Sequence, residues 1–138
     1  MSELGLRFHH LGLAVKAPRP AEVFLRAQGY ALGAWVHDPV QRVDLSFCIH
    51  PAEPAVEVIC PSKGDEDGPL RTILRTSDSL IYHACYQTGD LDGTLRAIHA
   101  QGLRALPVST RKPAVLFGGK EVSFYMVQGI GLVEFLCE

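Results

Sequence analysis

The stretch Phe8-His9-His10-Leu11 decides the fold, because it returns in altered form as Ile81-Tyr82-His83-Ala84. The same landmarks follow both stretches in the same order: an Ala-Gln-Gly tripeptide, and then a Val-Glu run that ends at Cys. These landmarks are Ala27-Gln28-Gly29 and Val56-Glu57-Val58-Ile59-Cys60 in the first copy, and Ala100-Gln101-Gly102 and Val133-Glu134-Phe135-Leu136-Cys137 in the second. The chain therefore contains two copies of one module.

The apolar spacing within each copy predicts the element order β-α-β-β-β. Short apolar runs alternate with Gly and Pro turns, and each copy has one helical stripe that ends at a Gly. The predicted strands are 7–15, 30–36, 42–49 and 55–60, then 80–88, 104–108, 114–117, 121–127 and 131–137, and the predicted helices are 21–28 and 91–100. We interpret residues 1–138 as one α+β domain, with internal repeats 6–61 and 79–138 joined by a connector at 62–78.

The overall composition excludes several classes of function. Apolar residues make up 47% and charged residues 20% of the 138 residues, and the formal net charge is −2. This balance gives no electrostatic basis for binding nucleic acid or an anionic membrane. No apolar run reaches the roughly 18 residues that a membrane span requires, and no signal peptide opens the chain, so we expect a cytoplasmic protein.

Four cysteines lie singly on predicted strands, and none belongs to a Cys-x-x-Cys pair. They are Cys48, Cys60, Cys85 and Cys137. We interpret them as small buried hydrophobic residues in a reducing compartment. A catalytic thiol is an alternative for Cys85, because it lies near His83 on the same predicted strand face.

The two-residue period of a strand assigns the repeated histidines and glutamates to one face. On the first strand, the face opposite His10 carries His9 and then only aliphatic residues, so it should pack against the helix. Each glutamate lies in mid-strand among apolar neighbours. The residues assigned to the concave side are His10 and Glu57 in the first copy, and His83 and Glu134 in the second.

Two buried carboxylates at equivalent positions require compensation, because burying one without a cation, a proton or good donors costs several kcal/mol. A divalent metal ion bound by two imidazoles and two carboxylates compensates both at once. We therefore predict one divalent metal ion per chain (cobalt, zinc, nickel or manganese), with the two modules forming a curled mixed sheet around it. The predicted metal ligands are His10, Glu57, His83 and Glu134.

The remaining histidines are weaker candidates for metal ligands. His9 competes with His10, but its counterpart in the second copy is Tyr82. His37, His50 and His99 lie at predicted turns or on a helix, and we expect them to be solvated.

Together these motifs resemble the vicinal oxygen chelate superfamily (glyoxalase/bleomycin resistance/dioxygenase), and within it methylmalonyl-CoA epimerase and its relatives. The run His9-His10-Leu11-Gly12-Leu13-Ala14-Val15 looks like the family's opening His-His-Ile-Gly-Ile-Ala-Val. Tyr82-His83-Ala84-Cys85-Tyr86 resembles its His-containing fifth strand, and Gly131-Leu132-Val133-Glu134-Phe135 its final strand. The resemblance implies the same four metal ligands, a small-molecule substrate of the coenzyme A thioester class, and a homodimer.

The function that this resemblance implies is metal-dependent epimerisation or isomerisation, by proton transfer next to the carbonyl of an acyl-thioester-like substrate. Glu134 is the candidate ligand that also acts as base, Glu57 is its counterpart, and Asp44 is the fallback base. The alternatives are a glyoxalase I-like lyase, a ring-cleaving dioxygenase and a non-catalytic antibiotic-sequestering protein. Iron oxygenases favour a three-residue facial triad, which disfavours the dioxygenase. A sequestering protein needs no buried His/Glu set.

Overall fold

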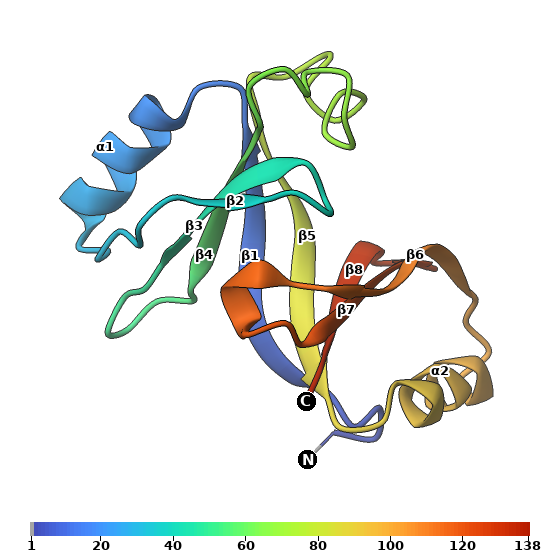
Figure 1. Ribbon diagram of the computed structural model, residues 1–138. Helices are drawn as coiled ribbons and strands as arrows, with labels where there is room; N and C mark the ends of the chain where they lie inside the picture. The colour runs from blue at the N-terminus through green and yellow to red at the C-terminus, as the bar shows by residue number, and fades with distance from the viewer. Residues whose placement is uncertain (1) are drawn as a thin grey trace. The chain divides into compact units, whose positions relative to one another are not determined.

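The computed structural model describes residues 2–138 (Figure 1). The chain divides into two compact units. The first unit comprises residues 10–82, and the second unit comprises residues 83–138 together with the N-terminal residues up to His9. Each unit holds the helix and the Glu-bearing strand of one sequence copy.

In the first unit, one helix packs on a mixed sheet. Its elements are β1 (Arg7–Val15), α1 (Pro18–Gln28), β2 (Val36–Asp38), β3 (Val43–Cys48) and β4 (Val56–Pro61). The strand order is β2-β3-β4-β1, with β1 parallel to β4 and the other neighbours antiparallel. Leu25 of α1 shares a buried cluster with Val15 and Val58, so one face of β1 and β4 is covered by the helix.

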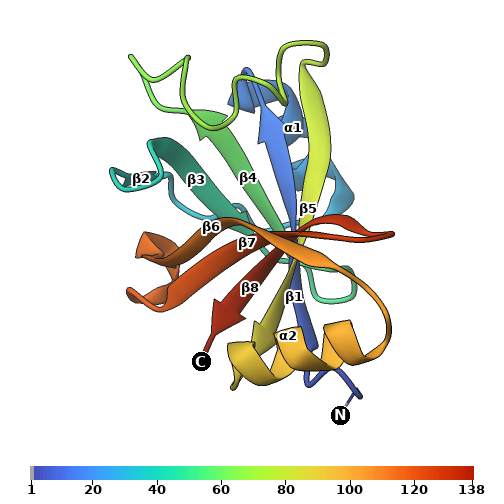
Figure 2. The same ribbon diagram turned by 90° about the vertical axis from the view of Figure 1, so that its right-hand side faces the viewer.

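The second unit repeats this arrangement, with an added 3-10 turn between its second and third strands. Its elements are β5 (Ser79–Thr88), α2 (Leu91–Ala100), β6 (Ala105–Pro113), the 3-10 turn η1 (Val115–Phe117), β7 (Glu121–Val127) and β8 (Gly131–Cys137). The strand order is β5-β8-β7-β6, with β5 parallel to β8. Figures 1 and 2 show β6, β7 and β8 side by side, and both pairings are antiparallel. Ile98 of α2 packs with Val133 and Phe135 of β8.

The N-terminal segment before β1 packs on the second unit. Leu4 and Leu6 lie against the apolar cluster between α2 and β8. The Thr94 hydroxyl of α2 donates a hydrogen bond to the Leu4 carbonyl at 2.9 Å. Residues from the start of the chain therefore complete a unit that is otherwise built from residues 83–138.

The two helices begin differently. α1 starts at Pro18, three residues before the predicted start, because the missing N–H of a proline costs nothing in the first turn of a helix. Its N-cap residue, Ala17, makes no side-chain cap bond. α2 is capped by Asp90, whose Oδ1 accepts a hydrogen bond from the Gly93 amide at 2.9 Å.

Three strand predictions differ from the structure. Where 30–36 is predicted, only Val36–Asp38 is a strand, and Ala31 forms an isolated bridge with Ile49. Where 114–117 is predicted as a strand, η1 forms a 3-10 turn that ends at Gly118 with a φ of 66°. β6 runs past the predicted end at 108, because two register shifts accommodate its irregular residues.

The predicted fold class is confirmed: the chain is α+β, with two β-α-β-β-β modules and mixed sheets. Among residues 2–138, neither helix has the length and apolarity that crossing a membrane would require.

Candidate functional site

His10 and Glu57 meet on neighbouring parallel strands of the first unit. The register of β1 and β4 aligns Gly12 with Glu57, and His10 lies two residues before Gly12 on the same strand face. His10 Nε2 is 3.6 Å from Glu57 Oε1. The relative exposures of the two residues are 0% and 4%, so both side chains are buried.

His83 and Glu134 form the matching pair in the second unit. Here β5 and β8 align Cys85 with Glu134, and His83 lies two residues before Cys85. His83 Nε2 is 3.3 Å from Glu134 Oε1, and both residues are buried. The repeated sequence therefore produces the same local geometry twice, because the two-residue strand period and the parallel register are the same in both units.

A phenylalanine packs against the histidine of each pair, and neither phenylalanine was predicted from the sequence. Phe47 of β3 is in register with Glu57, and Phe124 of β7 is in register with Glu134. The Phe47 ring meets the His10 ring edge-on with centroids 5.5 Å apart. The Phe124 and His83 rings are likewise edge-on, at 5.2 Å. Each phenylalanine thus restricts the orientation of its imidazole.

A sequence signal for these phenylalanines does exist. Ser46-Phe47 and Ser123-Phe124 are separated along the chain by the same interval that separates Glu57 from Glu134. A comparison of the two copies that extended to the strand before each glutamate would have found them.

The spacing within each pair fits two ligands of one cation. A charge-assisted hydrogen bond between an imidazolium and a carboxylate spans about 2.7–2.9 Å, whereas these pairs span 3.6 Å and 3.3 Å. Two ligands with metal bonds of about 2.0–2.2 Å lie about 2.8–3.1 Å apart at a right angle and about 3.3–3.6 Å apart at a tetrahedral angle. The donor chemistry and the distances are therefore those of a nitrogen and oxygen ligand set.

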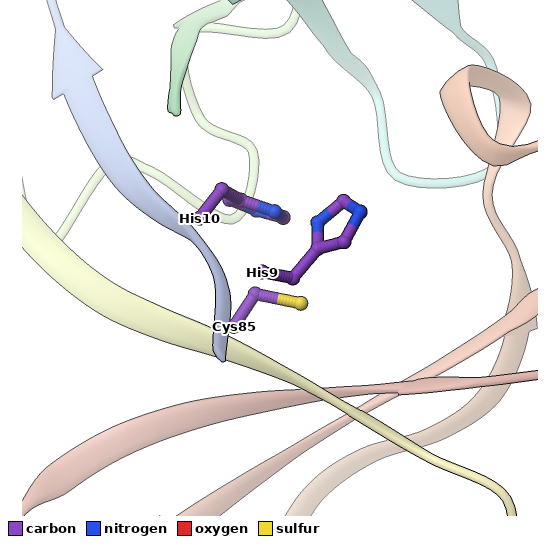
Figure 3. A group of neighbouring side chains, drawn as sticks. All are labelled: His9, His10 and Cys85. Atoms are coloured by element: carbon purple, nitrogen blue, oxygen red, sulfur yellow. The ribbon is translucent and has the colours of Figure 1, made fainter. Parts of the chain in front are cut away.

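His9 and Cys85, which both belong to the second unit, lie close together. Figure 3 shows them as neighbouring side chains, and a His9 ring nitrogen lies within 4.8 Å of the Cys85 sulfur. The His9 ring is edge-on to Phe117 of η1, with centroids 5.2 Å apart. His9 therefore does not pack against a helix as its strand face predicts, because the first residues of β1 belong to the second unit.

Asp44, the fallback base, lies on the wrong face of its sheet. It is three positions from Phe47 on β3, so its side chain points away from the face that carries Glu57. Its Oδ1 lies 2.9 Å from His37 Nδ1 and accepts a hydrogen bond from the Ser62 hydroxyl at 2.9 Å. This position does not support Asp44 as a base for chemistry at Glu57.

The other histidines divide into two groups. His37 and His99 are exposed, as expected. The expectation that His50 is solvated is wrong, because its side chain is only 13% exposed. Its Nδ1 accepts hydrogen bonds from the Ala52 and Glu53 amides at 3.0 Å and 2.9 Å, so the ring orders the turn before β4.

The cysteines match their interpretation as small hydrophobic residues. Cys48, Cys60 and Cys85 are buried, and Cys137 is partly buried. Burial, with a smaller contribution from Asp44, raises the pKa of the Cys60 thiol to about 11. Burial also raises the pKa of Cys137. Both thiols are therefore protonated near neutral pH, which suits packing rather than nucleophilic attack.

Comparison with known proteins places these features in a wider group. A family model described as Glyoxalase/Bleomycin resistance protein/Dioxygenase superfamily matches residues 9–124. Among curated proteins, none is significantly similar to the chain.

Solved structures share the fold. Methylmalonyl-CoA epimerase from Mycobacterium tuberculosis matches with a TM-score of 0.72 at 20% identity, covering 94% of this chain and 85% of that chain. A hypothetical protein from Bacillus halodurans matches with a TM-score of 0.74 at 19% identity, covering 96% and 94%. A variant of the Streptomyces coelicolor methylmalonyl-CoA epimerase, in complex with 2-nitronate-propionyl-CoA, matches with a TM-score of 0.67 at 20% identity, covering 96% of both chains.

Proposed function

Since this chain belongs to the glyoxalase/bleomycin resistance protein/dioxygenase superfamily, we propose that it is a divalent-metal-dependent epimerase or isomerase. The reaction is proton transfer at the carbon next to the carbonyl of an acyl-thioester-like substrate. The observation that carries the proposal is the repeated buried pair, His10 with Glu57 and His83 with Glu134, at ligand-like distances in both units.

One divalent ion per chain, held by all four residues, is the central part of the proposal. Two imidazole nitrogens and two carboxylate oxygens form a set that zinc, cobalt, nickel and manganese all accept. A single cation would offset the burial of both carboxylates, each of which would otherwise cost several kcal/mol. The alternative is that each pair is a buried ion pair that serves only stability.

Proton transfer is assigned to the two carboxylates. A bound divalent ion supplies Lewis acidity toward the substrate carbonyl oxygen and so lowers the cost of removing the neighbouring proton. Glu134, as a carboxylate, takes that proton, and Glu57, its counterpart in the other module, would return a proton from its protonated form. Phe124 and Phe47 keep the imidazoles of His83 and His10 in position through their edge-on contacts.

The proposed substrate is a coenzyme A thioester. Two of the similar solved structures are epimerases in complex with 2-nitronate-propionyl-CoA and with methylmalonyl-CoA. Such substrates carry an acidic proton next to a thioester carbonyl, which is the proton that the proposed reaction requires. The protein is further proposed to be cytoplasmic and homodimeric.

Metal analysis tests the ligand set directly. We expect protein purified without chelators, then loaded with cobalt or zinc and desalted, to retain one ion per chain by inductively coupled plasma mass spectrometry. His83→Ala and His10→Ala should each lower retention by at least about tenfold, because each removes a ligand. His99→Ala is the control, because His99 is an exposed histidine. Equal retention in all three variants would contradict the assignment.

Isotope exchange tests the reaction class. The metal-loaded protein is incubated in deuterium oxide with a panel of 2-substituted acyl-CoA thioesters, and deuterium at the α-carbon is measured by NMR. Incorporation that depends on added metal supports the proposal. Exchange into no thioester, with turnover of a hemithioacetal instead, would favour the glyoxalase I-like alternative, which uses the same four ligands.

A further inference from the structure

The face of the second-unit sheet that holds Glu134 changes from apolar to cationic along β7. Phe124 is in register with Glu134, and Met126 lies two residues after Phe124 on the same face. Met126 is paired with Leu106 of β6 and with Leu132 of β8, so this end of the face is apolar. The opposite end lies at the hairpin between β6 and β7 (orange in Figure 1), and there the side chains are different.

Two lysines occupy the hairpin end of this face. Lys112 of β6 is in register with Val122, so it lies on the same face as Phe124. Lys120 directly precedes β7, and the Ala114 amide donates to its carbonyl at 2.9 Å, which continues the ladder by one pair. Ala114 packs with Val122 in a buried cluster, as expected for residues on one face. The two lysines are diagonal neighbours, roughly 7 Å apart at their Cβ atoms.

The acidic groups near the hairpin are paired with arginines. Arg111 reaches Asp92 at the start of α2, at 3.4 Å, so its guanidinium lies on the helix side of the sheet. Glu121 is also paired with Arg111, at 3.5 Å. Glu138, directly after β8, is paired with Arg7 at 3.0 Å. Among residues 2–138, neither lysine of the hairpin is within ion-pair distance of a carboxylate, and both lysines are exposed. The face that holds Glu134 therefore carries two uncompensated positive charges at this end.

The backbone of the hairpin is ordered. The Phe117 and Gly119 amides donate to the Ala114 carbonyl at 3.2 Å and 3.0 Å, and Ala114 is buried. Gly118 and Gly119 have φ values of 66° and 81°, which glycine adopts without strain. A bound anion would therefore have to order only the two lysine side chains, which lowers the entropic cost of binding it.

We propose that Lys112 and Lys120 bind the phosphate groups of a coenzyme A thioester whose acyl end lies at Glu134. An ammonium group is a point charge that suits phosphate oxygens. Lys120 lies four residues from Phe124, the residue in register with Glu134, which is about 13 Å along a strand. The pantetheine arm between the thioester sulfur and the first phosphate is about as long as four extended residues, roughly 14 Å. One molecule can therefore reach from the base to the lysines.

This inference rests on the proposed function in one respect, because it takes Glu134 as the place where the acyl end lies. Recognition of the phosphates is a binding property and does not require the reaction. Binding and deuterium exchange can therefore be measured separately on the same protein.

Calorimetry with two ligands tests the assignment. Metal-loaded protein is titrated with propionyl-CoA and with propionyl-pantetheine, which has the same thioester and arm but no phosphate. We expect the parent to bind propionyl-CoA at least about tenfold more tightly, because two exposed charge contacts are added. The double variant Lys112→Ala with Lys120→Ala should bind both ligands equally. A parent without this preference, or a double variant that keeps it, overturns the proposal.

Matched variants separate the lysine pair from the overall charge. Arg111→Gln removes one positive charge from the same hairpin but on the helix side, so it should keep the preference for propionyl-CoA. Lys112→Arg with Lys120→Arg retains both charges and should keep it as well. If Arg111→Gln abolished the preference as fully as the alanine double variant, net charge and not the lysine pair would be responsible.

A competition measurement uses the parent alone and so remains valid if a lysine variant does not fold. ADP carries a diphosphate but no pantetheine arm. It should weaken the binding of propionyl-CoA and leave the binding of propionyl-pantetheine unchanged, and the competition should fade as ionic strength rises. ADP that competes with neither ligand, or equally with both, overturns the proposal.

Deuterium exchange distinguishes failure of this inference from failure of the proposed function. If acyl-pantetheine and acyl-CoA substrates exchange equally well in the parent and in the alanine double variant, the reaction stands and the phosphate site is wrong. If the preference for propionyl-CoA depends on the lysines but no thioester exchanges its α-proton, the phosphate site stands and the proposed reaction is wrong.

Discussion

The two units agree on one face of their sheets and differ on the other. On the face with the His–Glu pairs, histidine, glutamate and phenylalanine occupy the same register positions in both. On the helix side, α2 has a side-chain cap and packs with Leu4 and Leu6 of the N-terminal segment, whereas α1 has no side-chain cap. The positions that are proposed to bind one metal ion are alike in the two copies, and the positions around the helices differ.

The largest expected effect tests whether the two glutamates are equivalent in function as well as in position. Glu134→Gln keeps a carbonyl oxygen as a ligand but removes the base, because an amide does not accept a proton at useful pH. Deuterium incorporation should fall by about 100-fold or more, with at least half of the metal retained. Glu57→Gln should lose less than about tenfold, because the proposed abstracting base is still present.

Metal content must be measured on the same samples, so that loss of the ion is not mistaken for loss of the base. If metal-loaded Glu134→Gln exchanges the α-proton as fast as the parent, Glu134 is only a ligand. If Glu57→Gln is the more damaged variant, the roles of the two modules are reversed.

A medium effect is expected from making the start of α2 resemble that of α1. Asp90→Ala removes the bond from the Gly93 amide and should lower the free energy of unfolding by about 1 kcal/mol in urea denaturation. Asp92→Ala is the control, because Asp92 is also an acidic residue in the first turn but is not the cap. Loss of its exposed ion pair with Arg111 should change the free energy of unfolding little. Equal losses would mean that charge near the helix start, and not the cap, is responsible.

The smallest effect concerns two thiols at equivalent positions, Cys60 and Cys137. With a pKa of about 11, Cys60 should be only about one-thousandth thiolate at pH 8, and it is buried. Ellman's reagent should therefore modify Cys137, the partly exposed thiol, well before Cys60. Because the Cys60 pKa is raised, any reaction there should speed up as the pH rises toward 11. Cys60→Ser and Cys137→Ser assign the signals, and faster modification of Cys60 would contradict its burial.

The fold class and the superfamily were both predictable from the sequence. The pairing of His10 with Glu57 followed from the two-residue strand period and the repeat, which are local properties. By the same alternation, Val58 and Phe135 lie on the face opposite the glutamates, and both pack in the buried clusters that include helix residues. For these residues, the alternation along one strand was sufficient.

Features that depend on distant segments were not predictable in this way. His9 follows the alternation of β1 but contacts Phe117, because the start of that strand belongs to the second unit. The sequence predicts His50 to be a solvated turn residue, yet its ring accepts hydrogen bonds from two backbone amides. The turn η1 reads as a strand because its residues are apolar, although Gly118 closes a tight turn there.

The packing of Leu4 and Leu6 on the second unit has a consequence for biosynthesis. The first unit is one continuous segment, so its contacts can begin to form once residues 10–82 have left the ribosome. The second unit is complete only after β8 has been synthesised and the N-terminal residues have packed against it. The hydrogen bond from Arg7 to Glu138 joins residues that are 131 positions apart. Nascent chains should therefore carry an exposed leucine pair until synthesis is nearly complete. A fusion tag joined at the N-terminus would interfere with the packing of Leu4 and Leu6 on the second unit and leave the first unit largely undisturbed.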